Sequence, residues 1–291
     1  MKSILIFLVL FVLSLSGFSQ KGKVLESLKC QSKLLGYPVE YSIYLPADYE
    51  TSNRSYPVLY LLHGYSDDET GWVQFGEVAQ IADKGIESGD FSSVIIVMPN
   101  GKVSWYCNDY KMANPWENMF VKEFIPSIEK TYRIRAKKEF RAISGLSMGG
   151  YGSLMLAMRN PDLFSSCVAF SSGTFTDEEI IAMPDNTYKM YFGDIFGSSL
   201  AGEKRISDSW KDHSPLHLIY DVPRDKLKSI RFYIDCGDDD FLFEGNTQLH
   251  IQMRKLDIPH EYRTRNGGHE WPYWRSGLVE GLKFISQSFH R

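Results

Sequence analysis

Five short apolar segments, each ending in glycine or aspartate, constrain the fold of this chain more than any other feature. Strands that are buried on both faces of a parallel sheet have this near-continuous apolar character. Apolar residues at helical spacing fill the gaps between the segments, for example in "LVEGLKFISQSF". The alternation predicts a doubly wound α/β fold with its functional loops at the carboxyl ends of the strands. The five segments are "PVLYLLHG", "SSVIIVMPNG", "FRAISG", "SSCVAFSSG" and "IRFYIDCGDDD".

Two further regions complete this layout. Near the start, "VEYSIYLP" alternates apolar and polar residues, and with the preceding "VLESLKCQSKL" it predicts antiparallel pairing at one edge of the sheet. The one long gap, at about residues 173–229, is rich in aromatic residues. An insertion of this length is a candidate cap over the functional site.

The first residues have the pattern of a secretory signal peptide. Lys2 is followed by an unbroken apolar run from Ile4 to Leu13 and by the small-residue stretch Gly17-Phe18-Ser19. This run is too short for a stable membrane span, so a retained anchor is the weaker alternative. We expect residues 1–19 to be removed on export to the periplasm or the cell exterior. Residues 20–291 then form a single catalytic domain without a stable membrane anchor.

Charge and cysteine usage argue against several classes of protein. The net charge is −4 and no basic stripe is present, which makes nucleic acid a poor partner. The four cysteines lie far apart, without the spacing of a zinc site. Cys30 and Cys107 are a candidate disulfide pair in an exported protein, whereas Cys167 and Cys236 lie inside apolar segments and are expected to be buried. We expect neither a metal nor a cofactor.

The stretch "AISGLSMGGYG" places Ser147 between Gly145 and Gly149, where a strand is expected to become a helix. An ordinary strand-to-helix turn is one explanation. The other is a nucleophile elbow, in which a tight turn presents the serine hydroxyl to a substrate. In that layout an acid and then a histidine follow on later strand-end loops. The chain complies, with aspartates after "IRFYIDCG" and a histidine in "NGGHEW" after "HEYRTR".

His269 is the predicted general base, because it alone lies on a glycine-flanked loop downstream of the aspartates. The other histidines fall in an earlier loop, in the insertion, on a helical face, at a strand start or at the chain end: His63, His213, His217, His250, His260 and His290. For the acid, only Asp235 is excluded, since it is expected within the strand. Asp238, Asp239 and Asp240 remain open at this point; they lack the spacing of a calcium loop.

An oxyanion hole is expected from two backbone amides. One belongs to Met148, directly after the nucleophile, and the other to a loop after an early strand. "YLLHGYSDDETGW" supplies such a loop, with the Tyr65 amide pointing into the site. We interpret His63 in this loop as a structural histidine that bonds its own loop, rather than as a participant in the chemistry.

With these residues in place, the chain resembles the esterase D superfamily of α/β-hydrolases, which includes feruloyl and acetyl-xylan esterases, tributyrin esterases and mycolyltransferases. The resemblance implies a mostly parallel sheet with helices on both faces, Ser147 as nucleophile, His269 as base, and the Met148 and Tyr65 amides as oxyanion hole. It also implies Asp240 as the acid, with Asp239 as the fallback. The matching pieces, which extend in order over nearly the whole mature chain, are "YLLHGYSDDETGW", "WYCNDY", "FVKEFIPSIEKTYRI", "AISGLSMGGYGSLMLAMRNPDLFSSCVAFSSG", "CGDDDFL" and "GGHEWPYWRSGL".

The resemblance implies an esterase acting on feruloyl or acetyl esters of plant cell-wall polysaccharide, with an acylated oligosaccharide or polysaccharide as partner. A broad short-chain carboxylesterase, an acyltransferase of the mycolyltransferase kind and a catalytically inactive binding protein are the alternatives. Trp105, Tyr106 and Trp210 are candidate substrate contacts, with core packing as the competing role. The cluster Trp271, Tyr273 and Trp274 is expected to anchor the last helix. The sequence makes no prediction of the oligomeric state.

Overall fold

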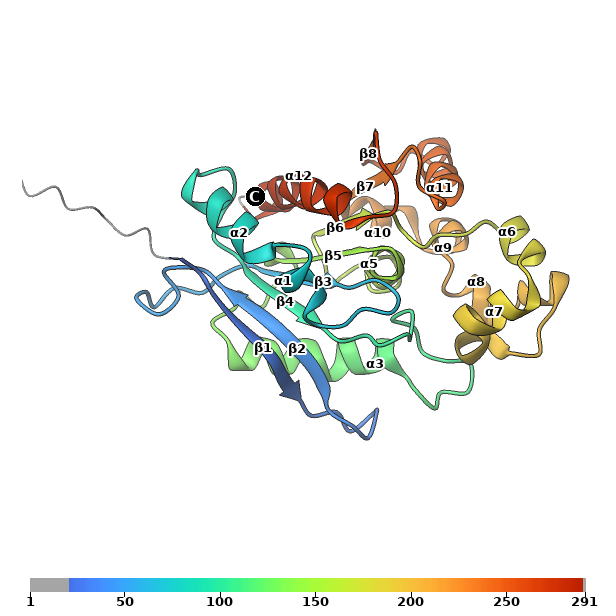
Figure 1. Ribbon diagram of the computed structural model, residues 1–291, viewed down its shortest axis with the longest axis horizontal. Coiled ribbons are helices and arrows are strands. Elements are labelled where there is room, and N and C mark those ends of the chain that lie inside the picture. Colours follow the sequence, from blue (N-terminus) through green and yellow to red (C-terminus); the bar gives the residue numbers. More distant parts are fainter. Residues whose placement is uncertain (1–20, 290–291) are drawn as a thin grey trace, which may run out of the picture.

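The computed structural model describes residues 21–289 and contains an eight-stranded sheet in the order β1-β2-β4-β3-β5-β6-β7-β8 (Figure 1). Strands β3 to β8 are parallel, and β2 runs antiparallel to both β1 and β4. The sheet therefore confirms the predicted mostly parallel fold and its antiparallel edge. The strands are β1 (Lys23–Cys30), β2 (Val39–Leu45), β3 (Val58–Leu62), β4 (Ile95–Pro99), β5 (Arg141–Leu146), β6 (Ser166–Phe170), β7 (Arg231–Gly237) and β8 (His260–Arg265).

Helices cover both faces of the sheet, as the alternating pattern predicts. Successive side chains of a strand point to opposite faces, so in β3 Leu59 and Leu61 pack with α2 and α12, while Tyr60 and Leu62 pack with the helices of the other face. The helices around the sheet are α1 (Gly71–Gln74), α2 (Val78–Glu87), α3 (Trp116–Met119), the π-helix η1 (Phe120–Phe124), α4 (Ile125–Thr131), the 3₁₀ helix η2 (Lys138–Phe140), α5 (Met148–Arg159), α11 (Phe243–Lys255) and α12 (Trp271–Ser288).

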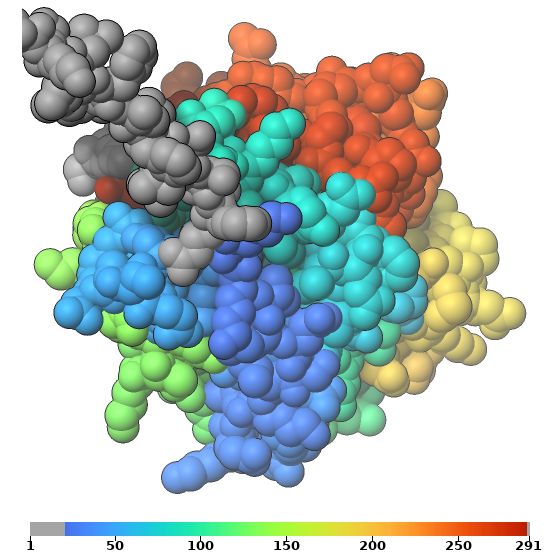
Figure 2. All heavy atoms as spheres, turned by 60° about the vertical axis from the view of Figure 1, so that its left-hand side comes forward, coloured from blue at the N-terminus to red at the C-terminus, as the bar shows by residue number. Residues whose placement is uncertain are grey.

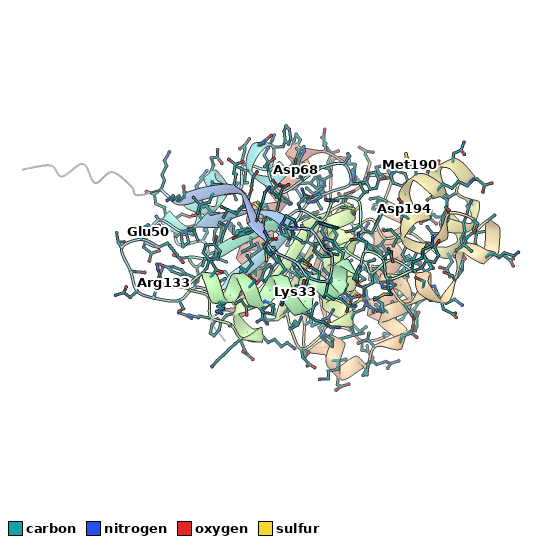
Figure 3. The ribbon with its side chains drawn as sticks, turned by 90° about the horizontal axis from the view of Figure 1, so that it is seen from below. Lys33, Glu50, Asp68, Arg133, Met190 and Asp194 are labelled. Atoms are coloured by element: carbon teal, nitrogen blue, oxygen red, sulfur yellow. The ribbon has the colours of Figure 1, made fainter. Side chains whose placement is uncertain are left out.

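The predicted insertion at 173–229 is helical. Its part at 177–211 lies at one end of the molecule, where Met190 and Asp194 mark it, and its later part packs against α5 and α11 (Figures 1 and 3). Its interior is aromatic, with Tyr188, Phe192 and Trp210 almost completely buried. The Tyr65 hydroxyl, on the loop after β3, donates to the Met190 carbonyl at 3.0 Å. The segments are α6 (Asp177–Ala182), α7 (Asp185–Phe192), the π-helix η3 (Gly193–Gly197), the 3₁₀ helix η4 (Gly202–Arg205), α8 (Asp208–Lys211), α9 (Pro215–Asp221) and α10 (Arg224–Lys228).

The four cysteines are buried free thiols. Cys30 and Cys107, the candidate disulfide pair, are therefore not joined, and the Cys107 thiol instead lies 3.3 Å from the Trp105 carbonyl oxygen. Cys167 and Cys236 lie within β6 and β7 and are buried there, as the apolar segments predict. The predicted signal peptide lies outside the described residues. No helix within residues 21–289 is long and apolar enough to cross a membrane.

Candidate active site

Ser147 lies between the end of β5 and the start of α5, with φ +54° and ψ −119°. Residues other than glycine rarely adopt this backbone conformation, and such strain is characteristic of a nucleophile elbow. The flanking glycines allow the turn: a Cβ on Gly145 would lie 2.5 Å from the Gly149 backbone, and a Cβ on Gly149 would lie 2.5 Å from the Leu62 carbonyl oxygen. The close approach of strand, turn and helix therefore requires glycine at both positions.

Three predicted side chains from separate loops meet at this turn. His269 Nε2 lies 2.9 Å from the Ser147 hydroxyl, and its Nδ1 lies 3.0 and 3.1 Å from the two carboxylate oxygens of Asp240. The Asp240 side chain is inaccessible to solvent, whereas the imidazole is 19% exposed. The arrangement can accept a proton from the serine hydroxyl and stabilise the resulting imidazolium.

Asp240 remains a carboxylate in spite of its burial. Burial raises its pKa, but hydrogen bonds from His269, from the Leu242 N–H and from the Ser171 hydroxyl outweigh that effect, so that the pKa lies below its ordinary value. The neighbouring aspartates point elsewhere. Asp238 accepts a hydrogen bond from the Gly267 N–H at 3.0 Å, and Asp239 is not among the hydrogen-bond partners of His269 within the described residues.

Ser171 and Trp274 form a support behind the acid that the sequence analysis did not identify. The Trp274 indole N–H donates to the Ser171 hydroxyl at 3.0 Å, and Ser171 in turn bonds Asp240. Ser171 follows β6 directly and has a φ of +43°. Its place at the carboxyl end of a central strand was the available signal, because functional side chains in this fold gather at that edge.

Asp235 links the strand ends and the helix that flank the acid and the base. Its buried carboxylate, in β7, accepts hydrogen bonds from Arg265 at the end of β8 and from the Tyr273 hydroxyl on α12. Next to it, a Cβ on Gly237 would lie 2.0 Å from the Gly267 carbonyl oxygen, so the two strand ends meet backbone to backbone. Asp235 lies within the strand, as predicted, and the contact to Tyr273 anchors α12 beside His269.

The two predicted oxyanion amides belong to segments that flank the serine. Met148 is the first residue of α5, and Tyr65 follows the turn at Gly64, whose Cβ, if present, would lie 3.5 Å from the Ser147 Cβ. His63 fixes this turn: its Nδ1–H donates to the Gly64 carbonyl at 2.8 Å, and its Nε2 accepts from the Gly101 N–H at 2.8 Å. Because it is buried, its pKa is lowered to about 4. The interpretation of His63 as a structural histidine of its own loop agrees with these contacts.

A cavity of about 630 Å³ opens beside Ser147 and His269. It is lined by residues 64–67, 146–147 and 269–272 together with Phe75 and Trp274. None of these residues belongs to the insertion, which therefore flanks this cavity and does not roof it. Within residues 21–289, no group of three or more histidine, cysteine or acidic side chains is arranged to hold a metal ion.

The aromatic residues assigned to substrate contact lie in the core instead. Trp105, Tyr106 and Trp210 are 4%, 0% and 1% exposed, and none of them lines the cavity. Tyr106 donates to the His63 carbonyl at 2.8 Å, and Trp210 donates to Asp177 inside the insertion at 3.0 Å. Their burial favours core packing, the competing role: Trp105 and Tyr106 pack between α5 and the segments beside it, and Trp210 packs inside the insertion. Trp271 and Trp274, which were expected only to anchor α12, line the cavity.

Comparison with known proteins shows the family of this chain. The family model described as "Putative esterase" matches residues 32–285. The chain belongs to this esterase family. An acetyl esterase of Caldicellulosiruptor saccharolyticus is 25% identical over 247 residues, which cover 82% of this chain and 86% of that protein. An endo-1,4-beta-xylanase/feruloyl esterase of Xylanibacter ruminicola is 35% identical over 150 residues, which cover 48% of this chain and only 20% of that protein.

The fold is shared with solved esterase structures. A ferulic acid esterase superposes with a TM-score of 0.78 at 31% identity, over 92% of this chain and 99% of that one. Family and fold together identify the chain as a carboxylic ester hydrolase with an esterase D-like α/β-hydrolase fold. The similar proteins include both an acetyl esterase and feruloyl esterases, so membership of this esterase family does not specify the acyl group of the substrate.

Proposed function

We propose that this chain is an exported serine esterase that uses Ser147, His269 and Asp240 and acts on feruloyl or acetyl esters of plant cell-wall polysaccharide. The observation that carries the proposal is the unbroken chain of contacts from Asp240 through His269 to Ser147, at distances of 3.0 and 2.9 Å, beside an open cavity. The substrate class is supported by the acetyl esterase and the feruloyl esterases to which the chain is similar.

In the proposed mechanism, the Ser147 oxygen attacks the ester carbonyl carbon while its proton passes to His269 Nε2. The carbonyl electron pair moves to oxygen, and the Met148 and Tyr65 N–H groups stabilise the oxyanion. The tetrahedral intermediate then collapses: its carbon–oxygen bond to the alcohol breaks, and His269 gives the alcohol its proton. A water molecule, deprotonated by His269, attacks the acyl-enzyme in the same way, which releases the carboxylic acid and returns the proton to Ser147.

A hydrolysis panel tests this proposal. The purified protein is assayed on methyl ferulate, acetylated xylan and short p-nitrophenyl esters, with Ser147→Ala as the blank. A preference for ferulate of about 100-fold, which corresponds to roughly 2.7 kcal/mol of transition-state binding, indicates an aromatic acyl pocket. A preference for acetyl esters indicates a small one. Activity that survives Ser147→Ala unchanged contradicts the mechanism, and acyl transfer to an added sugar instead of water indicates a transferase.

Export is tested separately on the full-length chain. Expressed with its N-terminus intact, the protein is expected outside the cytoplasm, with a mature N-terminus near Gln20, because residues 1–19 have the charged, apolar and small-residue regions of a signal peptide. N-terminal sequencing of the exported protein gives the cleavage site. A protein that stays in the cytoplasm with Met1 in place contradicts the localisation and leaves the esterase chemistry untouched.

A further inference from the structure

An aromatic wall, formed by Trp271 and Phe75, borders the cavity beside His269. The Trp271 ring contacts Trp72 and Trp274 at right angles, with centroids 5.3 Å apart in both pairs. The Trp271 ring stays partly exposed in spite of these contacts. Phe75 lies 5.9 Å from Trp271 with a tilt of 35° and is 51% exposed. The wall therefore offers apolar ring surface to a bound molecule.

A hydrogen bond and an ion pair fix the position of the aromatic wall. Arg275 on α12 donates to the Phe75 carbonyl at 3.0 Å and pairs with Glu77, so that the segment after α1 is tied to α12. Figure 2 shows these two segments, in cyan and red, meeting on the surface of the molecule. Trp72 is anchored in turn by a hydrogen bond from its indole N–H to the Leu62 carbonyl at 3.0 Å.

The charge of the cavity favours a neutral ligand that donates hydrogen bonds. Asp67 and Glu270 line it, and no lysine or arginine does. Among residues 21–289, Asp67 accepts a single hydrogen bond, from the Asp68 N–H at 2.9 Å. Its partial burial raises its pKa, and the neighbouring Asp68 carboxylate adds to this effect. Ionised carboxylates accept hydrogen bonds and repel anions, so this site suits hydroxyl groups and disfavours a negatively charged substrate.

The position of the wall assigns it to the alcohol part of the ester. His269 Nε2 must deliver a proton to the departing alcohol oxygen, so the alcohol leaves past this atom. Residues 270–272 and 274, which follow His269 directly, form the adjacent side of the cavity. A group that rests on Trp271 and Phe75 is therefore on the leaving side of the scissile bond.

We infer that Trp271, Phe75, Asp67 and Glu270 form a subsite for a neutral sugar ring, the alcohol component of the ester substrate. The two aromatic rings stack on the apolar C–H face of the sugar, and the two carboxylates accept its hydroxyl protons. This inference rests on the proposed esterase function and deepens it. Binding energy from the sugar, remote from the reacting carbonyl, then contributes to kcat/KM.

Matched ester pairs test the subsite. In each pair the acyl group is the same and only the alcohol differs: methyl ferulate against a feruloylated arabinoxylo-oligosaccharide, and ethyl acetate against an acetylated xylo-oligosaccharide. Trp271→Ala and Phe75→Ala are each expected to lower kcat/KM for the sugar ester by about 10-fold or more, with less than about 3-fold change for the simple ester. Tyr110→Ala is the control, since Tyr110 is a similarly exposed aromatic residue, 45% exposed, that does not line the cavity.

A second arm of the experiment does not depend on catalysis. Ser147→Ala, with and without Trp271→Ala, is titrated with unacylated xylo-oligosaccharide while tryptophan fluorescence is recorded. Saturable binding that Trp271→Ala weakens supports the subsite. In addition, Asp67→Asn with Glu270→Gln is expected to raise activity several-fold on an ester of an anionic alcohol such as glycolate, relative to ethyl acetate.

The outcomes separate the subsite from the function. Equal losses on both members of a pair, or no loss on either, overturn the subsite while the esterase function stands; since Phe75 does not touch His269, its variant guards against a mere disturbance of the base. If no ester is hydrolysed but the sugar titration succeeds, the proposed function fails and the binding site is retained. Absence of any sugar binding in the titration overturns the inference in either case.

Discussion

The loops at the carboxyl edge of the sheet and the helical insertion at 173–229 are built by different means. Ser66, Trp105, Tyr106, Ser147 and Ser171, all on strand-end loops, have positive φ values between 43° and 64°. In the insertion, positive φ occurs only at Gly197 and Gly202. The strand-end loops around Ser147 thus contain non-glycine residues in a strained backbone conformation, whereas no non-glycine residue of the insertion has a positive φ. At the nucleophile the loop gives up stability for geometry.

The insertion is held instead by short helices that pack around the buried side chain of Arg205. Arg205 is 1% exposed, donates to the carbonyl oxygens of Ile180 and Met183, pairs with Asp185 and lies over the Tyr188 ring. Its contacts join α6, α7 and η4. Because no residue of the insertion lines the cavity, damage to this hub and damage to the strained edge should have separable consequences.

The largest expected effect is on catalysis and falls on the strained edge. Ser147→Gly removes the nucleophile and is expected to lower kcat by about 10⁶-fold, by analogy with other serine hydrolases. The same change relieves a backbone strain of about 1–3 kcal/mol, because glycine accepts positive φ freely, and should raise the melting temperature. Ser147→Ala is the control, since it loses the hydroxyl and keeps the strain. A melting temperature that is equal in the two variants contradicts the comparison.

The second effect is on stability and falls on the insertion. Arg205→Met leaves buried carbonyl groups without donors and is expected to cost about 3–5 kcal/mol of unfolding free energy. Chemical denaturation measures this loss, and the specific activity of the fraction that remains folded should be preserved. Arg224→Met, an exposed arginine on α10, is the matched control and should change stability by less than about 0.5 kcal/mol. Lost activity at full folding would show that the insertion positions the site.

A third effect concerns stability at acidic pH and involves His63, on a loop at the carboxyl edge of the sheet. His63 has an ordinary pKa of 6.5, which burial lowers to about 4 in the folded state. Between these values the unfolded chain binds more protons, so stability falls with falling pH, by up to about 3 kcal/mol from this residue. His63→Asn is expected to be less stable at neutral pH but to show a shallower dependence from pH 6.5 to 4 in denaturation experiments. Identical slopes for the variant and the wild-type protein argue against this assignment.

The smallest effect concerns the support behind the acid. Ser171→Ala removes a hydrogen bond that lowers the pKa of Asp240, so kcat is expected to fall by about 10-fold, or roughly 1.4 kcal/mol. The NMR titration profile of the Asp240 carboxyl should move to higher pH, because the pKa of Asp240 rises when this hydrogen bond is lost. Ser172→Ala is the control, since the Ser172 hydroxyl bonds Thr174 instead. An unshifted profile means that Ser171 has only a packing role.

Much of the fold could be predicted because its signals are local. The apolar segments became β3 to β7, because burial on both faces leaves near-continuous apolar runs. "VEYSIYLP" became the antiparallel strand β2 beside β1, as its alternation predicts, although β2 is buried on both faces. The environment of Ser147 was also readable, because Gly145 and Gly149 mark a turn in which a Cβ does not fit.

The sequence by itself therefore determined the sheet, the elbow and the order of the loops. The residues by themselves left three adjacent aspartates open, and the family resemblance implied Asp240. The tertiary structure shows which of them meets His269, and it alone decided which aromatic residues face the cavity. Asp238, Asp239 and Asp240 are chemically identical, so the direction of the turn after β7 selects one. Trp105 and Trp271 have the same side chain, yet one is buried beside α5 and the other borders the cavity. The hydrophobic effect favours burial of any apolar ring and does not specify which residues it packs against. The packing of segments that are distant in the sequence therefore decides whether a ring lies in the core or at the cavity.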